Sequence, residues 1–451
     1  MAEAGPSGPA PPGCLSLVSR GTFRSRESRS VPRATPAGPV MKGEALAEGD
    51  PTPLGYVRTP SAGAAELSFQ DGRPLPAGQE ARLPLTAADI VPLRGYAGLR
   101  VRWPAGPEGV LETILALAAA GVPVHGGDAP GWLQDADPGL ARLLASWEPG
   151  PGDPSVRSVS DLRREEHSVR LRRHAFRRAT ATAPVLTGNG GALGAGTTAG
   201  SALRDTGAGG LGATASGAAP TPKVSVVMSS RRPTLLGSAL AQIARQRHVE
   251  VEVLLGLHGV PAAHPDVRRA VEAFPLPLTV VEADAATPFG RVLHDVAARA
   301  SGDDIAKWDD DDWYSPEHLA DLLMARAYSG ADIVGTAAEF FYLEPLNTTV
   351  RRTDYTSEVW SDHVAGGTIL LARETYQHIG GFEGVERGVD AQLLKTAHTA
   401  GARIYRTHGL GYVLRRTLAA GHTWQLPLAH FLRVSANQWR GFRPSRILET
   451  A

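Results

Sequence analysis

Residues 223 to 328 alternate between strand patterns and helix patterns, and this alternation constrains the fold more than any other feature. The run Val224–Met228 is almost purely apolar, which is typical of a strand buried on both faces of a parallel sheet. Further strands are predicted at 249–257, 278–282 and 305–308, and helices at 235–246, 267–273, 291–300 and 316–328. This order predicts an open α/β sheet, whose ligands bind beyond the carboxyl ends of its strands.

Two tracts of low complexity divide the 451-residue chain. Residues 1–80 are rich in Pro, Gly, Ser and Ala without apolar periodicity, so we expect a disordered N-terminal region there. Residues 184–221 are nearly all Gly, Ala, Thr and Ser, which predicts a flexible linker. These tracts leave a small accessory α/β segment at 81–183 and a larger domain at 222–445.

Composition excludes several classes of protein. The 46 basic and 46 acidic side chains cancel, which argues against a globally basic nucleic-acid binder. The single cysteine, Cys14, excludes a disulfide framework and a Cys-based zinc site. The longest apolar stretch, near 114–124, is far shorter than the roughly 20 residues of a membrane-spanning helix. The N-terminus also lacks the pattern of a secretory signal. We therefore expect no nucleic-acid partner, no transmembrane segment and a cytoplasmic location.

Four consecutive aspartates, 309 to 312, form the strongest chemical signal. They follow the strand predicted at 305–308 and precede a helix for which Ser315 is the expected N-cap. Adjacent carboxylates repel one another and need a cation. Mg²⁺ and Mn²⁺ take oxygen ligands, typically one or two carboxylates together with substrate phosphate oxygens. The run therefore predicts a metal site that holds a nucleotide diphosphate, and a solvated acidic turn is the alternative.

The same region resembles family 2 glycosyltransferases of the GT-A fold over about 222–443. The stretch KVSVVMSSRRPTLLGSALAQIARQ is similar to their first strand, nucleotide loop and helix, and FGRVLHDVAARASGDDIAKWDDDDWYSPEHLADLL is similar to the stretch that ends in their DxD motif. The resemblance implies a nucleotide-diphospho-sugar transferase with a Rossmann-like mixed sheet that uses Mn²⁺ or Mg²⁺. It places Asp309 at the nucleoside and the metal, and Asp311 at the metal, with Asp310 and Asp312 as alternates.

Further site residues follow from the resemblance. Asp390, in the first turn of a helix predicted at 389–400, matches the Asp of a Glu-Asp pair that serves as general base, although the pair here reads Val389–Asp390. A helix-start charge that interacts with the helix dipole is the alternative for Asp390. His422 resembles a late histidine that completes the metal coordination, and could equally be an ordinary surface histidine. Arg415 and Arg416 are candidates to pair with the diphosphate, and plain solvated charge is the alternative for each. Trp424 is a candidate stacking platform, with a buried core aromatic as the alternative.

The nucleotide pocket departs from the family pattern at one position. Ser229, Arg231 and Arg232 are candidate wall residues in the loop after the first strand. The family usually ends its second strand with an Asp that contacts uracil, but this chain has His258 there. Asp284, after the third strand, is the candidate substitute. The polar stretch 346–360 is expected to be a mobile loop that excludes water.

The small segment shows a fainter resemblance. EGVLETILALAAAGVPVHG is similar to a helix–strand unit near the end of GT-B glycosyltransferases, including spore-coat CgeB-like ones, and LRREEHSVRLRRHAFR is similar to the helix that closes such a domain. This resemblance implies a remnant without a catalytic role. The Arg-rich helix at 161–178 is interpreted as a salt-bridged surface helix, in preference to a nucleic-acid or membrane site.

Together, these features predict an inverting hexosyltransferase that moves a sugar from a nucleotide-sugar donor to a carbohydrate, lipid-linked or small-molecule acceptor. Two alternatives remain open. One is a degenerate GT-A module that binds a sugar or a partner. The other is a metal-dependent nucleotidyltransferase, for which the first loop, SSRRPTLLG, lacks the expected Gly-rich pattern.

Overall fold

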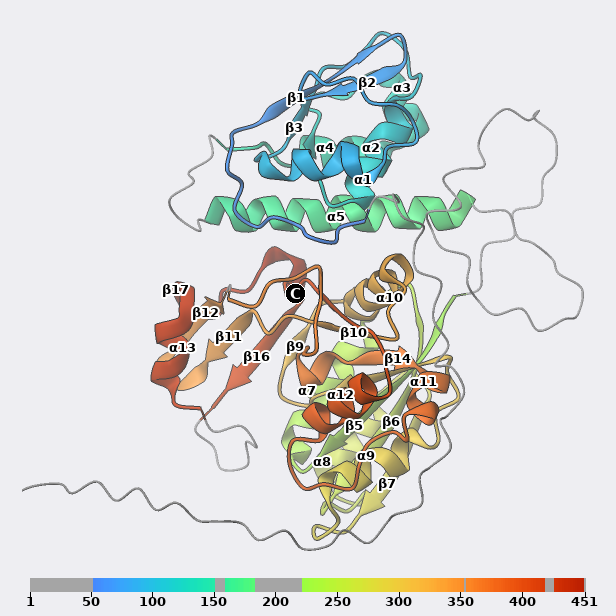
Figure 1. Ribbon diagram of the computed structural model, residues 1–451. Coiled ribbons are helices and arrows are strands. Elements are labelled where there is room, and N and C mark those ends of the chain that lie inside the picture. Colours follow the sequence, from blue (N-terminus) through green and yellow to red (C-terminus); the bar gives the residue numbers. More distant parts are fainter. Residues whose placement is uncertain (1–51, 151–158, 183–220, 353, 418–425, 450–451) are drawn as a thin grey trace, which may run out of the picture. The chain divides into compact units, whose positions relative to one another are not determined.

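The computed structural model describes residues 52–150, 159–182, 221–352, 354–417 and 426–449 (Figure 1). Within these residues the chain is a mixed α/β protein whose strands form three sheets, of four, eight and five strands. No helix in this part of the chain combines the length and the apolar character that crossing a bilayer requires.

The eight-stranded sheet confirms the predicted alternation of strands and helices. Its strand order is β13-β15-β10-β14-β8-β5-β6-β7. The strands β7, β6, β5 and β8 run parallel, whereas β14 is antiparallel to both of its neighbours, so the sheet is mixed. The strands are β5 (Lys223–Ser230), β6 (Glu250–His258), β7 (Leu278–Ala283), β8 (Asp304–Trp308), β10 (Ile333–Thr336), β13 (Val359–Trp360), β14 (Leu370–Ala372) and β15 (Ile404–Thr407). The helices of this region are α7 (Pro233–Ala244), α8 (Pro265–Glu272), α9 (Phe289–Ala297), α10 (His318–Ser329), α11 (Arg373–His378) and α12 (Val389–Thr399).

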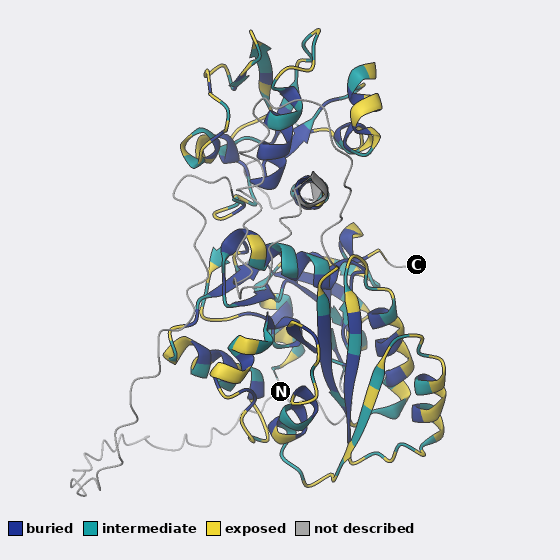
Figure 2. Cartoon of the chain, turned by 90° about the vertical axis from the view of Figure 1, so that its right-hand side faces the viewer, coloured by how far each residue is buried: buried dark blue, intermediate teal, exposed yellow. Residues whose placement is uncertain are grey.

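The apolar run of β5 is fully buried, as its sequence predicts. Figure 2 shows buried residues in dark blue along strands in the interior of the protein. Val226 and Met228 belong to one hydrophobic cluster, together with residues of α7, α8 and α10. Val227 belongs to another, with residues of α9, α11 and α12. Because successive side chains of a strand point to opposite faces, helices cover both sides of this sheet.

The five-stranded sheet was not predicted. Its order is β17-β12-β11-β16-β9. Its elements are β9 (Trp313–Tyr314), β11 (Phe340–Leu343), β12 (Thr348–Arg352), β16 (Tyr412–Arg416), β17 (Ser435–Arg440) and α13 (Leu428–Val434), with the 3-10 turns η2 (Glu344–Leu346), η3 (Gly366–Thr368) and η4 (Arg446–Leu448) nearby. The expected mobile loop at 346–360 is wrong, because this stretch contains β12 and β13. The expected cap at Ser315 is also wrong, since α10 begins at His318 with Glu317 as its N-cap.

The N-terminal sheet begins earlier than expected. Its order is β2-β1-β3-β4. Its elements are β1 (Ala65–Gln70), β2 (Arg73–Pro76), α1 (Ala87–Ile90), η1 (Val91–Gly95), β3 (Leu99–Val101), α2 (Val110–Ala119), β4 (Val124–His125), α3 (Gly131–Ala136), α4 (Pro138–Ala145) and α5 (Val159–Thr182). The prediction of disorder up to residue 80 is therefore wrong for β1 and β2. The alternating sequence AELSFQ of β1 was a signal for a strand, and its Leu67 is fully buried. The high glycine and proline content of the surrounding residues obscured this signal. The predicted linker lies, except for residue 221, outside the described residues.

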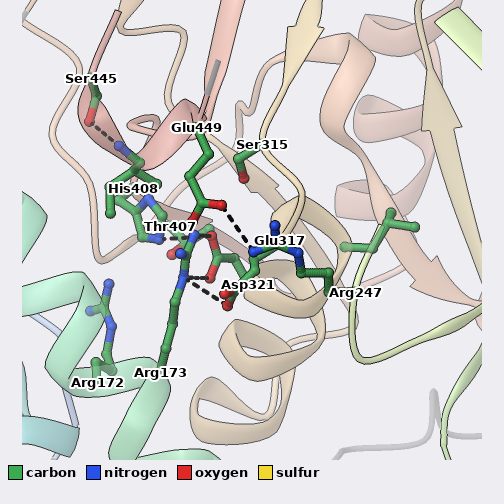
Figure 3. Close-up of polar contacts among 12 residues, drawn as sticks. Arg172, Arg173, Arg247, Ser315, Glu317, Asp321, Thr407, His408, Ser445 and Glu449 are labelled. Atoms are coloured by element: carbon green, nitrogen blue, oxygen red, sulfur yellow. Dashed lines mark hydrogen bonds and ion pairs between the residues drawn. The ribbon is translucent and has the colours of Figure 1, made fainter. Parts of the chain in front are cut away.

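Helix α5 is not the surface helix that its charge predicts. Arg164, Arg172 and Arg173 are at most 5% exposed. Arg173 donates to both carboxylate oxygens of Asp321 on α10, at 2.8 and 2.7 Å (Figure 3). Arg172 forms an ion pair of 2.9 Å with Glu358. The sequence predicts local partners along the helix, but these two arginines pair with acids more than 140 residues away in the chain.

Three buried histidines should make the protein less stable in mild acid. His167, His318 and His408 are at most 5% exposed, and burial lowers their pKa values to about 4, 3 and 4. The unfolded chain, with a histidine pKa of about 6.5, therefore binds more protons as the pH falls below 6.5. Each histidine should remove about 2 kcal/mol of unfolding free energy by pH 5.

Urea unfolding of the full chain between pH 7.5 and pH 5 would measure this loss. His318→Asn should flatten the pH dependence, whereas His264→Asn should leave it unchanged, because the His264 side chain is 37% exposed. A His318→Asn variant with the same pH dependence of stability as the wild type would contradict the prediction.

Candidate functional site

The four aspartates lie where β8 ends, beside the carboxyl end of its parallel neighbour β5. This is the edge at which parallel sheets bind ligands. The run continues directly into β9, so it links the eight-stranded sheet to the five-stranded sheet. Its position therefore agrees with the sequence prediction.

The four carboxylates have four different environments. Asp309 forms an ion pair of 2.6 Å with Lys307. Asp310 accepts hydrogen bonds from Ser230 and Arg232, and Asp311 pairs with Arg232 at 2.8 Å. Asp312 accepts a hydrogen bond from the hydroxyl of Tyr412. The sequence predicts that such a run needs a metal ion, but two side-chain cations already contact three of these aspartates and offset part of their charge.

Lys307 is the residue that the sequence analysis missed. It lies on β8, its side chain is 2% exposed, and its ammonium contacts Asp309 at 2.6 Å and Asp390 at 3.2 Å. Burial alone would lower the pKa of Lys307, but the carboxylates of Asp309 and Asp390 outweigh it and raise the pKa, so the ammonium keeps its charge. The sequence IAKW could have revealed this residue, because a lysine inside an otherwise apolar strand is seldom buried without a charged partner.

Lys307 brings together two residues that were predicted separately. Asp390 lies in the first turn of α12, and the side chains of Asp309 and Asp390 are each about one third exposed, 34% and 33%. The Oδ1 atom of Asp390 is buried against Lys307, so the exposed part of the carboxyl is available to a ligand. Burial raises the pKa of Asp390, and the charge of Lys307 opposes that rise.

Two glycines, Gly366 and Gly367, allow the carboxylates of Asp390 and Asp309 to lie close to the backbone. A Cβ atom on Gly366 would lie 2.2 Å from Oδ2 of Asp390, and one on Gly367 would lie 2.6 Å from Oδ2 of Asp309. Real Cβ atoms do not come this close to other heavy atoms. The Gly-Gly pair at the start of η3 therefore forms the surface against which both carboxylates rest.

The aspartates at the two ends of the run are held by tyrosines. The hydroxyl of Tyr314 accepts a hydrogen bond from the backbone N–H of Asp309 at 2.9 Å and donates to the carbonyl of Gly367 at 3.0 Å. Burial, reinforced by the neighbouring Asp311 and Asp309, raises the pKa of Asp312 well above its usual range. Both oxygens of Asp312 accept hydrogen bonds, one from the hydroxyl of Tyr412 and one from the backbone N–H of Arg415, so its carboxyl group is already engaged within the protein.

Some of the residues predicted to line the nucleotide pocket lie close to one another. Nε of Arg231 donates to Nδ1 of His258 at 3.0 Å, and Nη2 of Arg231 donates to the carbonyl of Ala285 at 3.1 Å. Burial and the charge of Arg231 lower the pKa of His258. Asp284 is exposed next to Ala285, so it lies near this group. Arg231 therefore connects the ends of β5, β6 and β7.

Ser229 lies within β5 rather than in the loop after it. Its hydroxyl is buried and has no hydrogen-bond partner among the described residues. This unpartnered hydroxyl near the ligand-binding edge of the sheet is compatible with a role in the pocket wall.

The predicted site residues near the C-terminal end of the chain differ in their surroundings. The backbone N–H of Arg415 donates to Asp312 at 2.9 Å, but its guanidinium pairs with Glu344 at 2.5 Å. Arg416 is 6% exposed and its guanidinium lies 5.4 Å from the centre of the Phe431 ring. The guanidinium of Arg415 therefore already has an acidic partner. The predicted metal ligand His422 and the predicted stacking residue Trp424 lie outside the described residues.

The oxygen chemistry of the site suits a hard divalent ion only in part. Asp309 and Asp311 offer carboxylate oxygens of the kind that Mg²⁺ and Mn²⁺ prefer, and two carboxylates are enough when a diphosphate supplies further oxygens. The described residues contain no group of three or more His, Cys, Asp or Glu placed to share an ion. Arg232 would also compete with an ion for Asp311. Asp309 and Asp311 therefore remain the predicted protein ligands of such an ion.

Comparisons with known proteins give only a weak likeness. No protein-family model matches the chain, and no curated protein matches it. One similar solved structure is the mannosyltransferase PcManGT from Pyrobaculum calidifontis in complex with GDP-Man and Mn²⁺, with 20% identity and a TM-score of 0.36 over 45% of this chain and 59% of that chain. Another is S. aureus TarS 1–349 in complex with UDP-GlcNAc, with 15% identity and a TM-score of 0.36 over 47% of this chain and 64% of that chain.

The match thus spans less than two thirds of the length of either structure. TM-scores of this size are too low for the likeness to establish the fold family or the activity of this chain.

Proposed function

We propose that the chain is a glycosyltransferase of GT-A type that moves a sugar from a nucleotide-diphosphate donor to an acceptor hydroxyl with inversion. The observation that carries the proposal is the Lys307 bridge. In this bridge, the ammonium of Lys307 contacts both the predicted nucleotide-side carboxylate, Asp309, and the predicted base, Asp390, at the ligand-binding edge of the sheet. The resemblance of the flanking sequence to family 2 glycosyltransferases supports the same assignment.

In the proposed reaction, Asp390 acts as the general base. Its exposed oxygen would accept the proton of the acceptor hydroxyl as that oxygen attacks the anomeric carbon, and the bond from that carbon to the diphosphate breaks. The raised pKa of Asp390 makes the carboxylate a stronger base, while Lys307 keeps it charged and oriented. The acceptor would be a carbohydrate, a lipid-linked compound or a small molecule.

Asp309 and Asp311 would hold Mn²⁺ or Mg²⁺, with His422 as a further predicted ligand. When bound, such an ion supplies positive charge to the departing diphosphate. Arg232, two residues beyond the end of β5, already contacts Asp310 and Asp311 and would orient them. Ser229, Arg231 and Asp284 would line the nucleotide side of the pocket.

One observation favours a second candidate function. Arg232 contacts Asp310 and Asp311, and Lys307 contacts Asp309, so these side chains offset part of the charge of the run without an ion. Such compensation by side chains is sufficient for a module that binds a nucleotide or a sugar without catalysing its transfer.

A donor screen decides between the two. Purified chain is incubated with UDP-, GDP- and dTDP-sugars in Mn²⁺ or Mg²⁺, and the release of nucleotide diphosphate is followed. Asp390→Asn should lower turnover by a factor of about 10²–10⁴ with little change in donor affinity. Asp311→Ala should weaken the dependence of activity on metal.

The matched control for this screen is Asp332→Asn, because Asp332 lies away from the site and its Oδ2 accepts a hydrogen bond from the backbone N–H of Arg403. Donor binding without release in any metal would favour the binding module. Release that survives both Asp390→Asn and Asp311→Ala would refute the assigned roles.

A further inference from the structure

A cavity of about 590 Å³ lies between the start of α5, strand β17 and the residues that follow β17. Its volume is within the range of small-molecule sites, about 300–1,000 Å³. The side chains that matter here are Arg163, Trp439, Phe442, Arg443, Arg446 and Glu449. None of them belongs to the site at Lys307.

The charge of this cavity is unbalanced. Arg163 pairs with Glu166 at 2.5 Å, and Glu449 pairs with Arg247 at 2.9 Å (Figure 3). Arg443 and Arg446 are exposed, and no described residue accepts a hydrogen bond from either guanidinium. The stretch 426–448 contains no Asp or Glu at all. Guanidinium groups bind phosphate and carboxylate groups through paired hydrogen bonds, and two of them line this cavity.

The cavity also has an aromatic wall that its neighbours hold in place. The ring centres of Phe442 and Trp313 are 4.7 Å apart. Trp439 stacks on Phe340, with ring centres 6.4 Å apart and an interplanar angle of 12°. Fixed aromatic rings beside cations can take the flat face of a sugar or a base.

The strand that follows the acidic run separates this cavity from the transfer site. Successive side chains of a strand point to opposite faces. The side chain of Tyr314 reaches Gly367 at the transfer site, whereas that of Trp313 packs on Phe442 at the cavity. The two sites therefore lie on opposite faces of β9, and a ligand in the cavity cannot be the reacting group.

We propose that this cavity is a second binding site, for a ring that carries a phosphate or carboxylate group. Arg443 and Arg446 would bind the anionic group, and Trp439 and Phe442 would contact the ring. Such a ligand could be an acidic or phosphorylated saccharide, or a nucleotide. The site is independent of the proposed transfer reaction and would exist in a binding module as well.

Calorimetric titration of the full chain tests the proposal without donor or metal. Glucose 6-phosphate should bind, and glucose should not. The variant Arg443→Gln/Arg446→Gln should weaken glucose 6-phosphate at least tenfold, while Arg440→Gln, on the same strand as Trp439 but outside the cavity lining, should match the wild type. Trp439→Ala should weaken glucose 6-phosphate more than inorganic phosphate. Thermal melting of each variant checks that it is folded.

UMP distinguishes the two sources of the ligand. A nucleotide site would bind UMP more tightly than glucose 6-phosphate and lose that advantage in Arg443→Gln/Arg446→Gln. A saccharide site would show no such advantage. The proposal is overturned if neither compound binds better than its uncharged parent, or if the double variant binds both as the wild type does. Because no sugar transfer is measured, failure of the glycosyltransferase assignment would leave this result unaffected.

Discussion

Lys307→Met is expected to lower the rate of the proposed sugar transfer about 100-fold or more. The substitution removes the only ammonium that contacts both Asp309 and Asp390 among the described residues, and leaves their two negative charges facing each other. Removing one preorganised charged group from an active site lowers turnover by about 10²–10³-fold. The measurement is the turnover number with the donor that the screen identifies, together with the Michaelis constant for that donor.

Stability gives a second readout that does not depend on activity. The Lys307 side chain is 2% exposed, but both of its partners are about one third exposed, so solvent screens part of the repulsion that the variant creates. We expect a loss of about 1–3 kcal/mol of unfolding free energy. Lys307→Met/Asp309→Asn removes one of the opposed charges, and should therefore recover stability without recovering turnover.

Lys395→Met is the matched control, because Lys395 is exposed on α12, the helix that carries Asp390. It should alter neither turnover nor stability measurably. Full activity in Lys307→Met, with unchanged stability, would show that the bridge has no functional role.

The sequence predicts the parallel strands well because their signal is local. Apolar runs such as Val224–Met228 occur where a strand is buried on both faces, and the structure places β5 within a residue or two of that prediction. Asp390 was selected as a candidate because it lies in the first turn of a helix that resembles a known motif. Its distance from Lys307 could not be predicted, since it depends on the close approach that Gly366 and Gly367 allow.

The failure to predict the five-stranded sheet and the wrong prediction of an exposed α5 have a common physical origin. The strands of the five-stranded sheet are two to six residues long, and apart from the β11–β12 hairpin they pair across distant parts of the chain, so local patterns do not reveal the sheet. The charge of α5 indicated a solvated helix, because its partners Asp321 and Glu358 are far away in the sequence. Charge patterns report which side chains are ionised, whereas burial depends on the tertiary partners that neutralise them.

Arg172→Met should therefore destabilise the protein strongly, by about 3–5 kcal/mol of unfolding free energy. The side chains of Arg172 and Glu358 are both 2% exposed and lie 2.9 Å apart. Glu358 also accepts hydrogen bonds from Tyr328 at 2.6 Å and Tyr405 at 2.9 Å. Burial alone would raise the pKa of Glu358, but Arg172 and these hydroxyl groups outweigh it and lower the pKa, so the variant leaves a buried charge without its cation.

Urea unfolding, followed by both circular dichroism and tryptophan fluorescence, would measure this effect. Arg177→Met is the matched control on the same helix: its side chain is 43% exposed and pairs with Glu317 at 2.6 Å, so its loss should be no more than about 1 kcal/mol. Arg172→Met/Glu358→Gln should regain much of the lost stability, because the uncompensated charge is removed. Equal stability of Arg172→Met and Arg177→Met would mean that the contact between α5 and Glu358 does not form in solution, and that charge along this helix is solvated as its sequence first indicated.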